Sequence, residues 1–150
     1  GGRPQEPDNV VQPLTTYYVG LYAAPSYVER FGLPKDEGDL AGHRFIGPAE
    51  TDSRAPFMRW LAERVEDDAV VFRSNETQAM QAAVTEGVGL GFLSLLSARR
   101  DPGLVEALPH RSEWDTTLWL VTHVDLHRTP RIQTFVKALR EAARSSCSLN

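Results

Sequence analysis

Hydrophobic and polar positions follow two different rhythms along this chain. Short apolar runs rich in β-branched and aromatic residues occur at 17–23, 44–47, 69–73, 88–93 and 116–123, and runs of this kind are typical of strands. Between them lie segments whose apolar residues recur every three or four positions, at 26–32, 57–65, 76–86, 94–99 and 129–143. That spacing is typical of amphipathic helices. Because strands and helices alternate, the pattern predicts an α/β domain.

Two elements carry more specific expectations. The run 69–73 is continuously apolar, which indicates a strand covered on both faces, as in a parallel or mixed sheet. The last helix has Thr129 as its expected N-cap and Pro130 as its first residue. One face of this helix should be buried, and it carries Ile132, Phe135, Val136, Leu139 and Ala143.

The helix expected at 76–86 begins with an unusually polar stretch. Its apolar face contains Met80, Ala83 and Val84, and Gly87 is placed to end it. The residues at its start are Ser74, Asn75, Glu76 and Thr77. Ser74 or Asn75 is the expected cap, and Glu76 suits the positive end of the helix dipole. The same N–H groups and hydroxyls also suit a ligand, because anions bind readily at helix N-termini that follow a strand.

Composition narrows the class of protein. A chain of 150 residues fits one ordinary domain, and its net charge of −4 argues against nucleic-acid binding over a broad basic face. The longest apolar run, at 87–98, is roughly half of what a bilayer span needs, so no membrane association is expected. With one cysteine, Cys147, the chain has no internal disulfide framework, and a cytoplasmic location is the expectation.

Chemically capable residues occur in groups that lack the partners catalysis needs. These are the acidic residues Glu63, Glu66, Asp67 and Asp68, the histidines His123 and His127, and Cys147. The acidic group follows an amphipathic helix and reads as a solvated helix end. The two histidines lie at a strand end and in a loop, without a third metal ligand nearby in sequence. No serine has the nucleophile-elbow pattern, so neither an enzyme, a metal site nor a cofactor is expected.

Four stretches, read in order, carry a family resemblance. Residues 20–47 contain Ala-x-Pro-x-Tyr, then Gly-x-Pro, Asp-Leu and a histidine, and residues 72–98 read as strand, asparagine, helix, Gly-x-Gly and strand. The run PGLVEALP follows, and in residues 118–143 Leu-Trp-Leu-Val precedes Arg-Thr-Pro-Arg. Together these stretches resemble the effector-binding domain of LysR-type transcriptional regulators.

This resemblance implies a periplasmic-binding-protein-like (type II) α/β domain with two lobes and a small-molecule cleft between them. Residues 17–124 correspond to the second lobe, and residues 125–146 to the return segment and last helix of the first. The family's DNA-binding winged helix-turn-helix, and most of the first lobe, have no counterpart in these 150 residues. DNA binding is therefore expected only through a domain missing from this chain, in a parent protein that forms homodimers or tetramers.

The resemblance also implies where the effector binds. Ser74, Asn75, Glu76 and Thr77 match the family's cleft-facing hinge, and a loop with Gly47, Pro48 and Ala49 matches a second segment at the cleft mouth. The expected partner is a small-molecule effector. The helix N-terminus leaves open that this effector is anionic. A transporter's solute-binding protein of the same fold is the alternative function.

Overall fold

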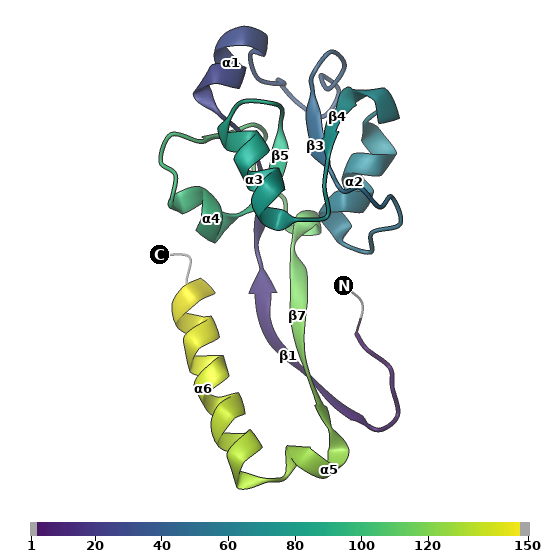
Figure 1. The fold of residues 1–150 in the computed structure, drawn as a ribbon, viewed down its shortest axis with the longest axis vertical. Coiled ribbons are helices and arrows are strands. Elements are labelled where there is room, and N and C mark those ends of the chain that lie inside the picture. Colours follow the sequence, from purple (N-terminus) through teal and green to yellow (C-terminus); the bar gives the residue numbers. More distant parts are fainter. Residues whose placement is uncertain (1–2, 148–150) are drawn as a thin grey trace. The chain divides into compact units, whose positions relative to one another are not determined.

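The computed structural model describes residues 3–147 and divides the chain into two compact units (Figure 1). The central unit spans Tyr18–Asp115. The terminal unit combines the two ends of the chain, up to Tyr17 and from Thr116 onward. In the described residues, none of the helices combines the length and the apolar character that a bilayer crossing requires.

Strands and helices alternate through the central unit, as the sequence pattern predicts. Its strands are β2 (Val19–Ala23), β3 (Phe45–Gly47), β4 (Val70–Arg73), β5 (Gly91–Ser94) and β6 (Val105–Glu106). Its α-helices are α1 (Pro25–Phe31), α2 (Pro56–Arg64), α3 (Thr77–Thr85) and α4 (Leu95–Arg99). Two 3₁₀ turns complete it, η1 (Asp67–Ala69) and η2 (Ser112–Trp114). Gly32 and Gly87 follow α1 and α3 with φ of 70° and 74°, a left-handed conformation that suits glycine and ends a helix.

The strands of the central unit form a three-stranded antiparallel sheet and a separate parallel pair. Strand β2 pairs antiparallel with β5 on one side and β6 on the other, while β3 pairs parallel with β4. A bridge between Phe45 and Leu90 connects the two sets of strands. Gly89 permits this approach, because a Cβ at that position would lie 2.8 Å from the carbonyl oxygen of Arg44. Because β3 and β4 pair in parallel, their carboxyl ends lie next to each other.

Large aromatic side chains fill one side of the core. Trp114 is fully buried, and its ring lies 5.3 Å from that of Trp60 and 5.1 Å from that of Phe92 in edge-on arrangements. On the other side, α3 packs Ala83 and Val84 against Ile46 and Leu93. Helices α2 and α3 are thus held by different parts of the core, and their ends near β3 and β4 are fixed in position.

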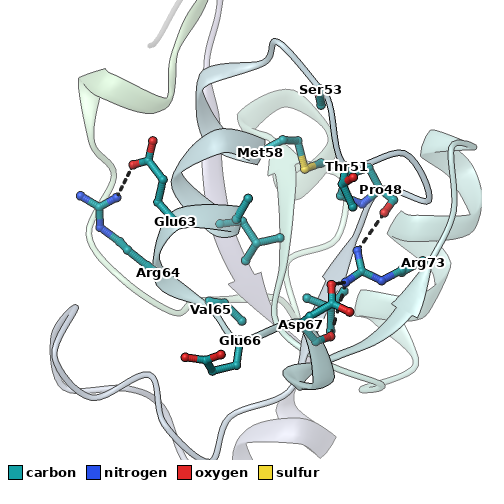
Figure 2. A pocket seen from close by; sticks show the side chains of 13 residues that line it. Pro48, Thr51, Ser53, Met58, Glu63, Arg64, Val65, Glu66, Asp67 and Arg73 are labelled. Carbon is teal, nitrogen blue, oxygen red and sulfur yellow. Dashed lines mark hydrogen bonds and ion pairs between the residues drawn. The ribbon is translucent and has the colours of Figure 1, made fainter.

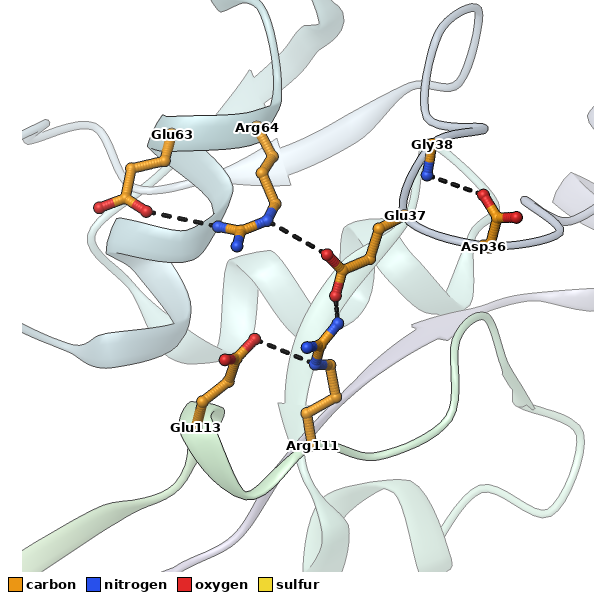
Figure 3. A network of polar contacts seen from close by, with 7 residues as sticks. All are labelled: Asp36, Glu37, Gly38, Glu63, Arg64, Arg111 and Glu113. Carbon is orange, nitrogen blue, oxygen red and sulfur yellow. Dashed lines mark hydrogen bonds and ion pairs between the residues drawn. The ribbon is translucent and has the colours of Figure 1, made fainter.

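A chain of ion pairs connects three surface segments of the central unit (Figure 3). The carboxylate of Glu37 pairs with Arg64 of α2 at 3.4 Å and also with Arg111. Arg111 pairs in turn with Glu113 of η2 at 3.0 Å. Because the side chains of Glu37 and Arg64 are about a third exposed, solvent screens these pairs, and their contribution to stability is modest.

The terminal unit consists of a long antiparallel ribbon and a helix. Strand β1 (Asn9–Tyr17) pairs with β7 (Thr116–His123), with an irregularity between Pro13 and Thr15, where proline cannot donate to the ladder. Short helix α5 (Val124–His127) leads to α6 (Pro130–Cys147), which packs against β1. Gln12 of β1 accepts a hydrogen bond from Arg140 of α6.

Several sequence expectations about single elements are wrong. The strand expected at 17–23 is two strands, β1 and β2, separated at Tyr18 and belonging to different units. Strand β4 is not covered on both faces, because Val71 in its middle is 46% exposed. Helix α6 begins at Pro130 with Thr129 at its N-cap as predicted, because the Thr129 carbonyl accepts the Gln133 N–H at 3.0 Å; the Thr129 hydroxyl donates to the Leu126 carbonyl. Phe135 is 60% exposed, whereas Val136, the next residue, is 4% exposed, so the buried face of α6 is narrower than the sequence predicts.

Candidate functional site

The two segments that the sequence singles out lie together at the carboxyl ends of β3 and β4. The Ser74 N–H donates to the Gly47 carbonyl at 3.1 Å, which extends the parallel pairing one step beyond the strands. Ligands of α/β sheets commonly bind beyond the carboxyl ends of parallel strands. The structure therefore brings the candidate residues of both segments into one surface.

Asn75 connects these segments through its side chain. Its Oδ1 accepts hydrogen bonds from the backbone N–H groups of Ala49, at 3.2 Å, and of Glu50, at 3.3 Å. Its Nδ2 donates to the Glu50 carboxylate at 3.2 Å. Since both ends of the amide are occupied, Asn75 acts as a brace that positions the loop after β3.

The start of α3 differs from the expected capping arrangement. The residue at the N-cap is Glu76, and its side chain makes no capping hydrogen bond. Ser74 Oγ accepts from the Glu76 N–H at 3.0 Å, one residue before the helix, so the prediction that Ser74 or Asn75 caps α3 is wrong. Helical geometry leaves the N–H groups of Thr77, Gln78 and Ala79 without a carbonyl from a preceding turn. These donors form the positive end of a helix of 9 residues.

The exposure of the candidate residues separates contact groups from supporting ones. Asn75, Glu76 and Thr77 are exposed, whereas Gly47 is buried. A Cβ at Gly47 would lie 3.0 Å from Val70 Cγ1, so this position contributes its backbone carbonyl and close packing. The side chains that stand free for a ligand are those of Glu76 and Thr77, beside the N–H groups of α3.

A pocket of about 360 Å³ lies in the same unit, between α2, the loop after β3 and β4 (Figure 2). Of the seven predicted site residues only Pro48 lines it. Its other lining residues are Thr51, Ser53, Met58, Leu61, Ala62, Glu63, Arg64, Val65, Glu66, Asp67, Val70 and Arg73. Sequence reasoning missed the pocket because its walls come from three separate elements. A charged Arg73 at the end of an otherwise apolar strand was the available signal.

The groups weighed for catalysis or metal binding are engaged elsewhere. His123 Nδ1 accepts from the Asp125 N–H at 3.3 Å, and His127 Nδ1 lies 2.9 Å from Thr122 Oγ1. Over the described residues, no group of three or more His, Cys, Asp or Glu residues is arranged to hold a metal ion. Asp67 is 91% exposed, in keeping with a solvated helix end. The Cys147 side chain lies outside the described part of the structure.

The chain belongs to the LysR substrate-binding domain family, because the model of that family, described as the LysR substrate binding domain, matches residues 1–144. A curated relative is the probable HTH-type transcriptional regulator LtrA of Klebsiella pneumoniae, which is 28% identical over 141 residues. That match covers 87% of this chain and 45% of the relative. The chain thus spans less than half the length of this relative.

Solved structures show the same fold. The regulatory domain of CrgA, a LysR-type transcriptional regulator from Neisseria meningitidis, has a TM-score of 0.76 and 21% identity, covering 95% of this chain and 72% of that one. Full-length AphB, the virulence activator of Vibrio cholerae, has a TM-score of 0.70 and 15% identity, covering 92% of this chain and 49% of that one. These matches confirm the predicted periplasmic-binding-protein-like α/β fold.

Proposed function

We propose that this domain senses a small-molecule effector on behalf of a LysR-type, DNA-binding transcriptional regulator. The observation that carries the proposal is the surface at the ends of β3 and β4, where Asn75 braces one loop against the start of α3. Its groups are hydrogen-bond donors and small polar side chains with no catalytic partner. Such groups hold a ligand without transforming it.

Thr77 and Glu76 are the proposed contact residues, with Ser74, Asn75, Gly47, Pro48 and Ala49 shaping the loops around them. The unpaired N–H groups of α3 favour an effector that carries a carboxylate or another anionic group. The Glu76 carboxylate repels such a group at one edge, which limits where the anion lies. Recognition without catalysis fits a family of regulatory domains and favours the regulator over an enzyme.

The parent protein is proposed to act in the cytoplasm as a homodimer or tetramer that binds DNA through another domain. Residues 17–124 form the proposed second lobe and 125–146 the return segment of the first. The structure also divides the chain into two units, although it assigns β7 (116–123) to the unit of the chain ends and not to the central one; a division into two units favours an organisation in two lobes. To act as a switch, the effector must bind one arrangement of the lobes more tightly than another, because equal affinity shifts no equilibrium. Family membership favours this function over a transporter's solute-binding protein.

A comparison of two threonines tests the proposed contact. Thr77 and Thr85 are exposed residues at the first and last positions of α3, so valine at either site makes the same chemical change. A panel of small carboxylates is screened by thermal shift, and hits are titrated by calorimetry. Thr77→Val should weaken a hit by about two- to tenfold, the range of one lost hydrogen bond. Thr85→Val should leave it unchanged.

Two results would count against the proposal. Equal effects of the two valine variants would place the ligand elsewhere. Loss of folding in Thr77→Val with intact affinity in the remaining folded protein would make Thr77 a structural residue. In the full-length gene product, Thr77→Val should also reduce the effector response of a promoter reporter, while Thr85→Val should not.

A further inference from the structure

We infer that the pocket beside α2 is a second binding site, for a small molecule with an apolar body and one carboxylate. All of its walls belong to the central unit, and it shares only Pro48 with the proposed effector surface. A volume of about 360 Å³ lies within the range of small-molecule sites. Its apolar lining includes Met58, Leu61, Val65 and Val70.

Arg73 supplies the charge that selects a carboxylate. Its side chain is 29% exposed, and its Nη1 donates to the Pro48 carbonyl at 3.2 Å. Its Nη2 pairs with the Asp67 carboxylate at 2.5 Å. A guanidinium held beside apolar side chains binds carboxylates through two parallel hydrogen bonds, a geometry that lysine does not offer.

Asp67 occupies the place that the ligand's carboxylate would take. Its own side chain is 91% exposed, so the pair is weak and easily exchanged. Arg73 keeps a second contact with η1 when Asp67 leaves, since Nη2 also lies 3.4 Å from the Asp67 carbonyl oxygen. The other acidic residues on the rim, Glu63 and Glu66, lie away from Arg73 (Figure 2). A bound carboxylate therefore competes chiefly with Asp67.

The position of Arg73 links this pocket to the effector surface. Arg73 immediately precedes Ser74, and the carbonyl it holds belongs to Pro48, next to the loop that Asn75 braces. A ligand that draws Arg73 away from Pro48 frees one support of that loop. The pocket is thereby placed to tune the loop after β3 without touching α3.

The two methionines of the chain allow binding in the pocket to be followed by NMR, with one methyl group as the probe and the other as the reference. Met58 lines the pocket, whereas Met80 packs against the core formed by Ile46, Ala83, Val84 and Leu93. In protein labelled with ¹³C-methyl methionine, titration with 4-methylpentanoate should move the Met58 signal saturably and leave the Met80 signal in place. The amide 4-methylpentanamide, which has the same body without the charge, should bind at least about fivefold more weakly.

Two neighbouring aspartates provide the matched variants. Asp67→Asn removes the internal competitor and should tighten 4-methylpentanoate binding by about two- to fivefold, the worth of an exposed ion pair. Asp68→Asn makes the same change in net charge at a residue that does not line the pocket, and should leave the affinity unchanged. Arg73→Gln should abolish the preference for the acid over the amide.

The inference is overturned by any of three results. The Met58 methyl fails to move in the Asp67→Asn protein, the amide binds as well as the acid, or the two aspartate variants behave alike. Because Asp67 is exposed, its variant is expected to fold even if Arg73→Gln does not. The Met58 signal reports on this pocket alone. The proposed effector surface is tested separately, by the affinities of the Thr77→Val and Thr85→Val variants.

Discussion

Replacing Asn75 by alanine tests how the candidate surface is assembled. Three hydrogen bonds are lost, two from the N–H groups of Ala49 and Glu50 and one to the Glu50 carboxylate. All three lie at the surface, where water replaces the lost partner, so the net cost falls well below the sum of three buried bonds. We expect a loss of about 1 kcal/mol, confined to the loop after β3.

Amide hydrogen exchange measured by NMR resolves this local effect. A loss of about 1 kcal/mol corresponds to roughly fivefold faster exchange at Ala49 and Glu50. Exchange at Leu90 should stay unchanged, because its N–H donates to the Arg44 carbonyl, away from the loop. Asn75→Asp made together with Glu50→Gln is the matched control, since it keeps an oxygen acceptor for both N–H groups and does not place two carboxylates against each other.

The outcome separates a brace from a passive surface residue. If Asn75 holds the loop, the alanine variant speeds exchange at Ala49 and Glu50 and the aspartate variant largely preserves their protection. Unchanged exchange in the alanine variant would refute the reasoning. Equal acceleration in both variants would also refute it, because protection would then depend on the Nδ2 donor to Glu50.

Two further predictions concern stability. Phe135→Ala should change the free energy of unfolding by less than about 0.5 kcal/mol, because the ring is exposed. Val136→Ala, on the buried face, should lower it by about 1–3 kcal/mol. If urea denaturation ranked the two variants in reverse, the assigned face of α6 would be contradicted. Burial raises the pKa of Tyr27 above its usual 10.0. The stability that the neutral Tyr27 side chain contributes is therefore complete below pH 10 and is lost as the pH rises through the folded-state pKa. In urea denaturation at a series of pH values, Tyr27→Phe should therefore lose less stability above pH 10 than the wild type does. At neutral pH the variant should be less stable by about 1–2 kcal/mol, because the Arg44 N–H loses its acceptor. A loss of stability above pH 10 as steep as that of the wild type would contradict this.

Local sequence patterns predict most elements of this fold, because each element carries its own signals. A serine directly before a short helical segment predicts a cap, and Ser94 Oγ accepts the Ser97 N–H at 3.0 Å. Gly87 ends α3 as predicted, and Gly89, in the same glycine-rich run, permits the close approach of Arg44. These features depend on backbone conformation and on neighbours a few residues away.

Features that depend on tertiary neighbours could not be predicted this way. The apolar run of β4 reads as doubly covered, yet Val71 is exposed, because covering a face of a strand depends on elements far away in the sequence. Asn75 reads as a helix cap, yet its amide turns to a loop 25 residues earlier in the chain. The pocket beside α2 escaped sequence reasoning for the same reason, since Arg73 and Pro48 meet only through the pairing of β3 and β4.

The central claim is that the first turn of α3 binds an effector, and backbone ¹⁵N NMR tests it most directly. The carboxylate from the screened panel with the highest affinity is titrated into the labelled chain while the amide signals are followed. The largest saturable shifts should fall on Thr77, Gln78 and Ala79, and Thr77→Val should weaken the binding that produces them. Shifts confined to other residues, with the amides of α3 unmoved at saturation, would contradict it.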